Sequence, residues 1–128
     1  MVIKSIEEID KIANEIICCK THLLPIDSSD YEHLKEISSS IEAIKIDLPI
    51  LTYDSIASIE DELTTIDQNT ISSGIFFICE NNIITMDQLE MLSSLIIKHI
   101  DIKNYTFGLG GVSTYPKGAE IYIIIGYN

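Results

Sequence analysis

The residues of this sequence best suited to chemistry are two carboxylates three positions apart, Asp27 and Asp30, in the stretch LPIDSSDYEHL. A pair of carboxylates on a loop is able to orient a water molecule or to hold a metal ion. The same residue types also have a structural use, because Asp and Ser at a helix start accept hydrogen bonds from unpaired backbone N–H groups. On the local sequence, helix capping is the stronger interpretation of this pair, and a catalytic role is the alternative.

Three glycines, Gly108, Gly110 and Gly111, form the second motif and are candidate ligand-binding residues. Glycine-rich phosphate loops lie between a strand and the N-terminus of a helix, so that backbone N–H groups face the phosphate. Here a turn and another strand are expected to follow instead. A β-bulge or close backbone packing is therefore the stronger interpretation, and ligand binding is the alternative.

Cysteine and histidine residues do not predict a metal site. Cys18 and His22 would lie one helical turn apart if the preceding helix continued, with Cys19 beside them. A zinc site requires three or four ligands, and neither His33 nor His99 has a suitable spacing to this pair. The expected role of His99 is to interact with the helix dipole near the end of its own helix.

The sequence contains no nucleophile elbow, Walker sequence, dinucleotide fingerprint or HExxH motif. We therefore expect no metal, no cofactor and no complete catalytic centre within the chain.

The charge of the chain restricts its partners. Twenty acidic residues against eight basic ones give a net charge of −12, and all eight basic residues are lysine. Nucleic acid and anionic membranes would be repelled, and bidentate recognition of phosphate by arginine is not possible. A protein partner or self-association is expected instead. The lack of a long apolar stretch, of a signal peptide and of a disulfide pattern predicts a cytoplasmic protein.

Hydrophobic periodicity predicts the elements that position these residues. Helices are expected over residues 5–20, 29–44, 55–67 and 86–100, and strands over residues 45–53, 74–79, 104–112 and 119–127. Capping boxes are expected to start at Ser5, Ser29 and Thr85. Pro49 favours an edge or irregular position for its strand.

The length fits a single domain over residues 1–128. The order of elements predicts an α+β fold in two layers, with a mixed sheet of about four strands and helices packed on it. Because a short turn joins the last two strands, we expect them to close the fold as a C-terminal antiparallel hairpin.

This order of elements resembles the C-terminal half of the tubulin homologue FtsZ, starting from the long central helix of that family. The stretch PIDSSD, residues 25–30, lies where the family has a loop reading N-x-D-F-A-D, with the same D-x-x-D spacing. Pro25 stands in place of the loop's Asn, and Ser28 and Ser29 in place of Phe and Ala. The segments GIFFICENN, YTFGLGGVS and AEIYIIIGY resemble the closing strands of the family.

The resemblance implies a division of labour. In the family, the N-terminal half binds the nucleotide through a glycine-rich loop, and the C-terminal half offers two Asp residues to the nucleotide of the next subunit. The 128 residues contain no such loop, so GTP is not expected to bind this chain alone. We therefore expect a non-catalytic interaction or assembly module with an FtsZ C-terminal-like fold.

Two alternatives stay open at this point. One is a small enzyme or ligand-binding domain whose site forms at a subunit interface. The other is a protein that stimulates a GTPase in trans through Asp27 and Asp30.

Overall fold

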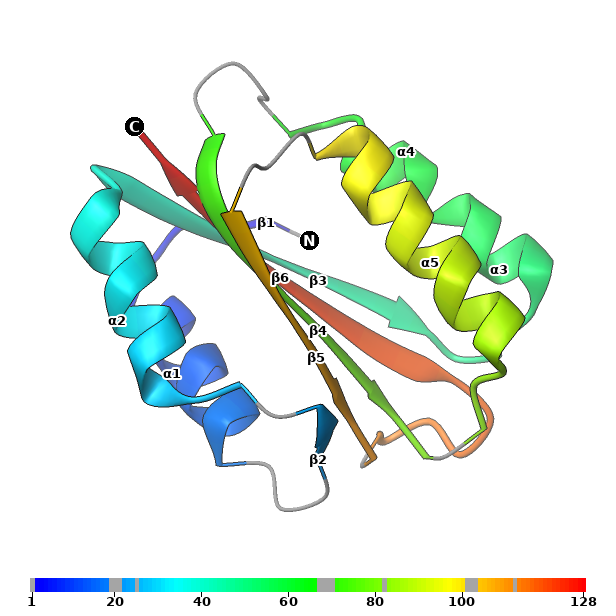
Figure 1. The fold of residues 1–128 in the computed structure, drawn as a ribbon. Coiled ribbons are helices and arrows are strands. Elements are labelled where there is room, and N and C mark those ends of the chain that lie inside the picture. Colours follow the sequence, from blue (N-terminus) through cyan, green and yellow to red (C-terminus); the bar gives the residue numbers. More distant parts are fainter. Residues whose placement is uncertain are drawn as a thin grey trace.

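The computed structural model of the protein describes residues 2–18, 22–24, 26–66, 71–81, 83–100, 104–111 and 113–128. The described strands form one six-stranded mixed sheet, and helices cover both of its faces (Figure 1). In chain order the elements are β1 (Val2–Ile3), α1 (Ile6–Ile17), β2 (His22–Leu24), α2 (Ser28–Ile37), β3 (Ser40–Leu48), α3 (Tyr53–Ser58), α4 (Glu60–Leu63), β4 (Ile71–Glu80), α5 (Met86–His99), β5 (Asn104–Gly110) and β6 (Ala119–Tyr127).

The expected α+β class, with helices packed on a mixed sheet, is confirmed, but the sheet has six strands rather than about four. The two additional strands, β1 and β2, are two and three residues long and lie at the two edges. Strands this short carry no readable alternation of apolar and polar residues. They were therefore missing from the sequence-based prediction.

The strand order is β1-β3-β6-β4-β5-β2, and it corrects the expected C-terminal hairpin. Strand β4 lies between β5 and β6, pairing parallel with β5 and antiparallel with β6. Helix α5 makes the crossover that a parallel pair requires. Strand β6 is buried along almost its whole length, which suits a position inside the sheet better than one at its edge.

Helices on both faces give the molecule three layers rather than the expected two. Helices α1 and α2 lie on one side of the sheet, and α3, α4 and α5 lie on the other (Figure 1). Alternate residues of β4 supply the two cores, because successive side chains of a strand point to opposite faces. Ile75 and Phe77 pack with α1 and α2, whereas Phe76 and Ile78 pack with the other three helices.

The predicted helix over residues 29–44 is wrong in its second half. Helix α2 ends at Ile37, and β3 begins at Ser40. Strand β3 pairs with β6 over its full length, from Ser40↔Tyr127 to Leu48↔Ala119. These long-range hydrogen bonds, together with the burial of Ile44, outweigh the helical spacing of the isoleucines.

Helix starts agree with the sequence only in part. The Thr85–Gln88 capping box is confirmed, with the Gln88 N–H donating to Thr85 Oγ1 at 3.1 Å. Ser5 caps α1 without a side-chain hydrogen bond. The box expected at Ser29 is wrong by two positions, because α2 starts at Ser28 after its N-cap, Asp27. The helix predicted over 55–67 is divided into α3 and α4.

In the part of the chain that the structure describes, no helix has both the length and the apolar character needed to span a membrane.

Candidate functional site

The carboxylate pair forms the N-terminal cap of α2. Asp27 Oδ1 accepts hydrogen bonds from the backbone N–H of Ser29 at 2.9 Å and of Asp30 at 3.3 Å, and from the Ser29 hydroxyl. Asp30 Oδ2 in return accepts the N–H of Asp27 at 3.1 Å. The Ser29 hydroxyl, followed by the Asp30 N–H, lowers the pKa of Asp27 below its ordinary value. The capping interpretation of this pair is confirmed.

Capping uses one oxygen of each carboxylate. Among the described residues, no donor is bonded to Asp27 Oδ2 or to Asp30 Oδ1. Asp27 is exposed and Asp30 is half-buried. The pair therefore presents negative charge at the surface while it holds the start of the helix.

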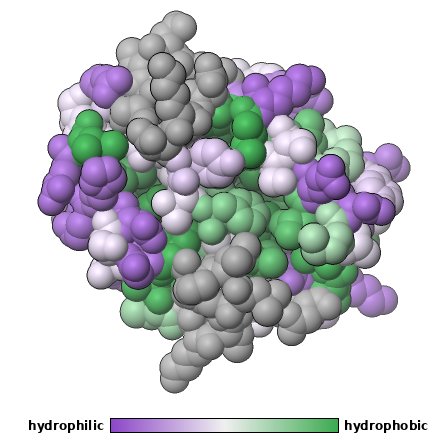
Figure 2. Space-filling view, in the orientation of Figure 1, coloured by the Kyte–Doolittle hydropathy of each residue, from purple (hydrophilic) through white to green (hydrophobic). Residues whose placement is uncertain are grey.

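An open depression of about 630 Å³ lies beside Asp30, between the first turns of α2 and the starts of β4 and β5. Its lining is Ser29, Asp30, His33, Ser73, Gly74, Ile75, Tyr105 and Thr106. Figure 2 shows the side of the molecule on which β5 lies, with hydrophobic surface in the middle and hydrophilic surface toward the helices. Tyr105 contributes an exposed aromatic ring, 46% accessible, to the lining of the depression.

The glycines of β5 have a packing role at one position. A Cβ atom at Gly108 would lie 2.6 Å from Phe77 Cδ2 and 2.7 Å from Ile26 Cδ1. Close packing of backbone against side chains therefore accounts for Gly108. Gly110 pairs with Cys79 of β4, and none of the three candidate glycines lines the depression beside Asp30. Ligand binding by Gly108, Gly110 and Gly111 stays a prediction.

The structure does not bring Cys18 and His22 onto one helix. Helix α1 ends at Ile17, Cys18 is its C-cap, and His22 begins β2. Cys19 and the side chain of His22 lie outside the described part of the chain. Within that part, no group of three or more His, Cys, Asp or Glu side chains is placed to hold a metal ion.

The structure describes the surroundings of the other two histidines. His99, in the last turn of α5, has Nε2 2.9 Å from Glu60 Oε1 and so ties α5 to α4. His33 lines the depression beside Asp30.

Sequence reasoning missed a pair of consecutive polar residues at the end of β4. Glu80 is fully buried, and its Oε2 accepts the N–H groups of Ile83 at 2.6 Å and Ile84 at 3.2 Å. Its Oε1 is buried without a hydrogen-bond partner among the described residues. The Asn81 amide bonds the backbone of Ser113 in both directions, at 2.8 and 3.0 Å. Glu80 therefore holds the residues that lead into α5, and Asn81 holds Ser113, which lies between β5 and β6.

Glu120 of β6 completes this network and was also missed. Its carboxylate accepts both the N–H and the hydroxyl of Thr114 at 2.9 Å and the Tyr122 hydroxyl at 3.1 Å, and lies 3.4 Å from Lys45 Nζ. Burial acts to raise the pKa of Glu120, but the hydrogen bonds and Lys45 outweigh it and leave the pKa below its ordinary value. A Glu inside the apolar run AEIYIIIGY was the available signal.

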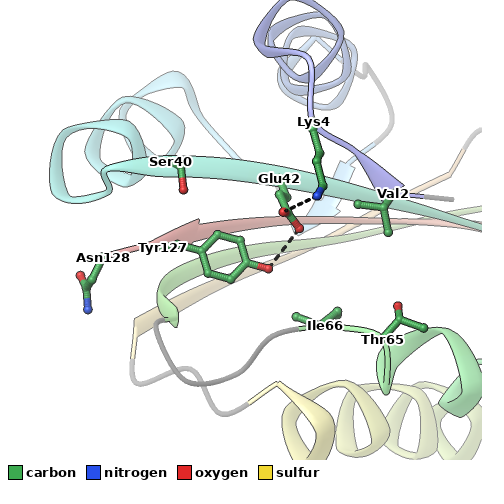
Figure 3. A pocket seen from close by; sticks show the side chains of 8 residues that line it. All are labelled: Val2, Lys4, Ser40, Glu42, Thr65, Ile66, Tyr127 and Asn128. Atoms are coloured by element: carbon green, nitrogen blue, oxygen red, sulfur yellow. Dashed lines mark hydrogen bonds and ion pairs between the residues drawn. The ribbon is translucent and has the colours of Figure 1, made fainter.

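A second depression, of about 470 Å³, lies beside the β1 edge of the sheet (Figure 3). Its charged side chains face one another. Glu42 Oε1 is 3.7 Å from Lys4 Nζ, and Glu42 Oε2 accepts the Tyr127 hydroxyl at 3.2 Å. These contacts occupy both oxygens of Glu42 within the molecule.

No protein-family model matches the chain, and no curated protein sequence matches it. Solved structures do match, at low sequence identity. An FtsZ dimer from M. jannaschii has 9% identity and a TM-score of 0.64, over 95% of this chain and 40% of that chain. A four-stranded TubZ-Bt filament has 12% identity and a TM-score of 0.66, over 94% of this chain and 33% of that chain.

A protofilament of CetZ2 from Haloferax volcanii, bound to GTPγS, has 10% identity and a TM-score of 0.54, over 80% of this chain and 34% of that chain. The chain therefore spans between a third and two-fifths of the length of these proteins. Together with the order of its elements, this likeness shows that the chain has the fold of the C-terminal domain of the tubulin and FtsZ proteins.

Proposed function

We propose that this chain is a cytoplasmic interaction or assembly module that uses an FtsZ C-terminal-like fold to contact protein and does not bind GTP alone. The observation that carries the proposal is the match of nearly the whole chain to about two-fifths of an FtsZ chain. Three of the matching structures are described as a dimer, a filament and a protofilament. A fold that recurs in assemblies is a reason to expect protein contacts here, although fold alone does not determine function.

The chemistry of the described residues supports the same proposal. Asp27 and Asp30 have the spacing of the family's catalytic loop, but one oxygen of each carboxylate caps helix α2. The glycines of β5 are followed by a turn and a strand rather than by a helix. A net charge of −12 repels the phosphates of a nucleotide unless a site neutralises them.

The test is the mass of the purified chain in solution, measured by light scattering at several concentrations with and without GTP and Mg²⁺. We expect the mass at each concentration to be the same with and without nucleotide, and no release of phosphate from GTP. A change of mass on addition of GTP, or turnover of GTP by the chain alone, would overturn the proposal.

A second function is favoured by one specific observation, the uncommitted oxygens Asp27 Oδ2 and Asp30 Oδ1. They would allow the pair to reach the nucleotide of a GTP-hydrolysing subunit of the tubulin family and to stimulate it in trans. The discriminating variant is Asp27→Asn, because Asn caps a helix about as well as Asp but carries no charge. This function predicts that stimulation is lost in Asp27→Asn while the helical circular dichroism is unchanged. Equal stimulation by the variant and the parent chain would exclude it.

A further inference from the structure

Four exposed apolar residues gather at the end of the molecule where α3 and α5 begin. Ile50, Tyr53, Ile83 and Met86 have exposed fractions of 62, 55, 40 and 79%, and they are called here the apolar end patch. Isolated exposed apolar residues are ordinary, but a group of large ones at one place indicates an interaction site.

Separate contacts bring the segments that carry the patch together. The N–H of Leu51 donates to the carbonyl of Lys117 at 2.8 Å, and Ile50 forms a β-bridge with the same residue. Gln88 Nε2, in the first turn of α5, donates to the carbonyl of Leu51 at 3.4 Å. Helices α3 and α5 pack on each other, and their N-terminal ends lie at the same end of the molecule (Figure 1).

Polar side chains and close backbone packing hold described residues next to the patch. Glu80 fixes the backbone of Ile83, and Asn81 fixes that of Ser113. The backbone of Gly118 packs directly on Leu48 and Pro49. A surface whose backbone is already held by such contacts loses less conformational entropy on binding. The apolar end patch is therefore prepared to bind, whereas exposed loop residues are commonly mobile.

The charges around the patch indicate which kind of partner would bind there. Asp54 and Asp87 are exposed in the first turns of α3 and α5, beside Tyr53 and Met86, and they outnumber the exposed Lys117 that pairs with Ile50. Two copies of the patch placed face to face would bring these carboxylates together within two molecules that each carry a charge of −12. The same carboxylates would attract a basic partner and so strengthen its binding. An amphipathic helix with an apolar face and flanking Lys or Arg residues matches this surface in both respects.

We infer that the apolar end patch is a docking surface for a basic amphipathic helix of a partner protein. The inference rests on the proposed function as an interaction module and names the surface and the chemistry of the partner. Ile50 and Met86 are the expected anchors, because they are the most exposed apolar side chains of the patch.

The test uses the full chain and a synthetic Leu/Lys peptide of roughly 18 residues, about five helical turns, designed with Leu on one face and Lys on the other. A scrambled peptide has the same composition and charge without an apolar face. Calorimetric titration is expected to show tighter binding of the amphipathic peptide. The double variant Ile50→Ser with Met86→Ser is expected to weaken that binding by about tenfold or more.

The matched control is Ile97→Ser, which removes a 43% exposed isoleucine of α5 outside the patch and should leave the affinity unchanged. Circular dichroism of each variant checks that the fold is retained. Equal affinity for the two peptides, or equal affinity of the double variant and the parent chain, would overturn the inference.

Loss of self-association in the double variant, with peptide affinity unchanged, would assign the patch to a second copy and would also overturn it. GTP titrated into the same samples tests the proposed function separately. Peptide results therefore bear on the patch alone, and a GTP response bears on the function alone.

Discussion

Replacing Glu120 by alanine is expected to lower the free energy of unfolding by about 2 kcal/mol. The variant removes a side chain that is only 8% exposed and takes its carboxylate from the Thr114 N–H, the Tyr122 hydroxyl and the Lys45 ammonium, which keeps Asp47 at 3.7 Å. Thr114 is exposed, and Tyr122 and Lys45 are half-buried, so water replaces part of what the carboxylate supplied and the loss is the net value of the hydrogen bonds to a charged group. Chemical denaturation followed by circular dichroism measures the change.

The matched control is Glu120→Gln, which keeps one side-chain oxygen for Thr114 and removes the negative charge facing Lys45. We expect the Gln variant to lose less stability than the Ala variant. Equal stability of the Ala variant and the parent chain would show that the network does not stabilise the fold.

The pH dependence of the same comparison has a definite sign. The pKa of Glu120 in the folded chain lies below its ordinary value of 4.5. The stabilisation by the charged carboxylate is therefore fully present above that value and is lost as the pH falls through the lower, folded pKa. The stability difference between the parent chain and Glu120→Gln should shrink as the pH falls below 4.5. A constant difference down to the acid transition would contradict this assignment.

Replacing Gly118 by alanine is expected to lower the free energy of unfolding by about 3 kcal/mol through overpacking. A Cβ atom there would overlap the carbonyl oxygen of Leu48 and lie 2.5 Å from that of Pro49. Both are backbone atoms, so no change of side-chain rotamer relieves the contact. The backbone of residues 48 and 49 would have to move away from the start of β6. The shift of the thermal midpoint and the denaturant midpoint measure the effect.

Gly108→Ala is the comparison variant, because the atoms that its Cβ would meet belong to the side chains of Phe77 and Ile26. We expect a smaller loss for Gly108→Ala, and a partial recovery when Ile26→Val removes one of the crowding atoms. Equal losses at Gly118 and Gly108 would show that the identity of the crowding atoms, backbone or side chain, does not decide the cost.

The sequence predicts the candidate site only where the interacting residues lie close to one another in the chain. Asp27 and Asp30 were recognised as a helix cap because the donors and acceptors of a cap lie within three residues of each other. Glu80 ends one apolar run and Glu120 lies within another, but nothing close to them in the sequence identifies the groups that their carboxylates bind. Lys45 is the partner of Glu120 that is distant in the chain, and its position depends on the pairing of β3 with β6.

The sequence by itself determined the elements whose signals are local. The strand of residues 119–127 and the helix beginning at Met86 with its Thr85–Gln88 cap were predicted with these starts. The class of the fold followed from the order of such elements. Periodicity and capping involve residues at most a few positions apart, so a single sequence contains them in full.

Only the tertiary structure decided which strands are neighbours, and with them the three layers and the apolar end patch. Ser40 pairs with Tyr127, so residues expected to continue a helix become a strand because of a partner at the far end of the chain. The position of β6 between β3 and β4 likewise replaces the locally simpler hairpin. Burial and hydrogen bonds between distant segments stabilise such pairings. No local pattern of residues predicts them.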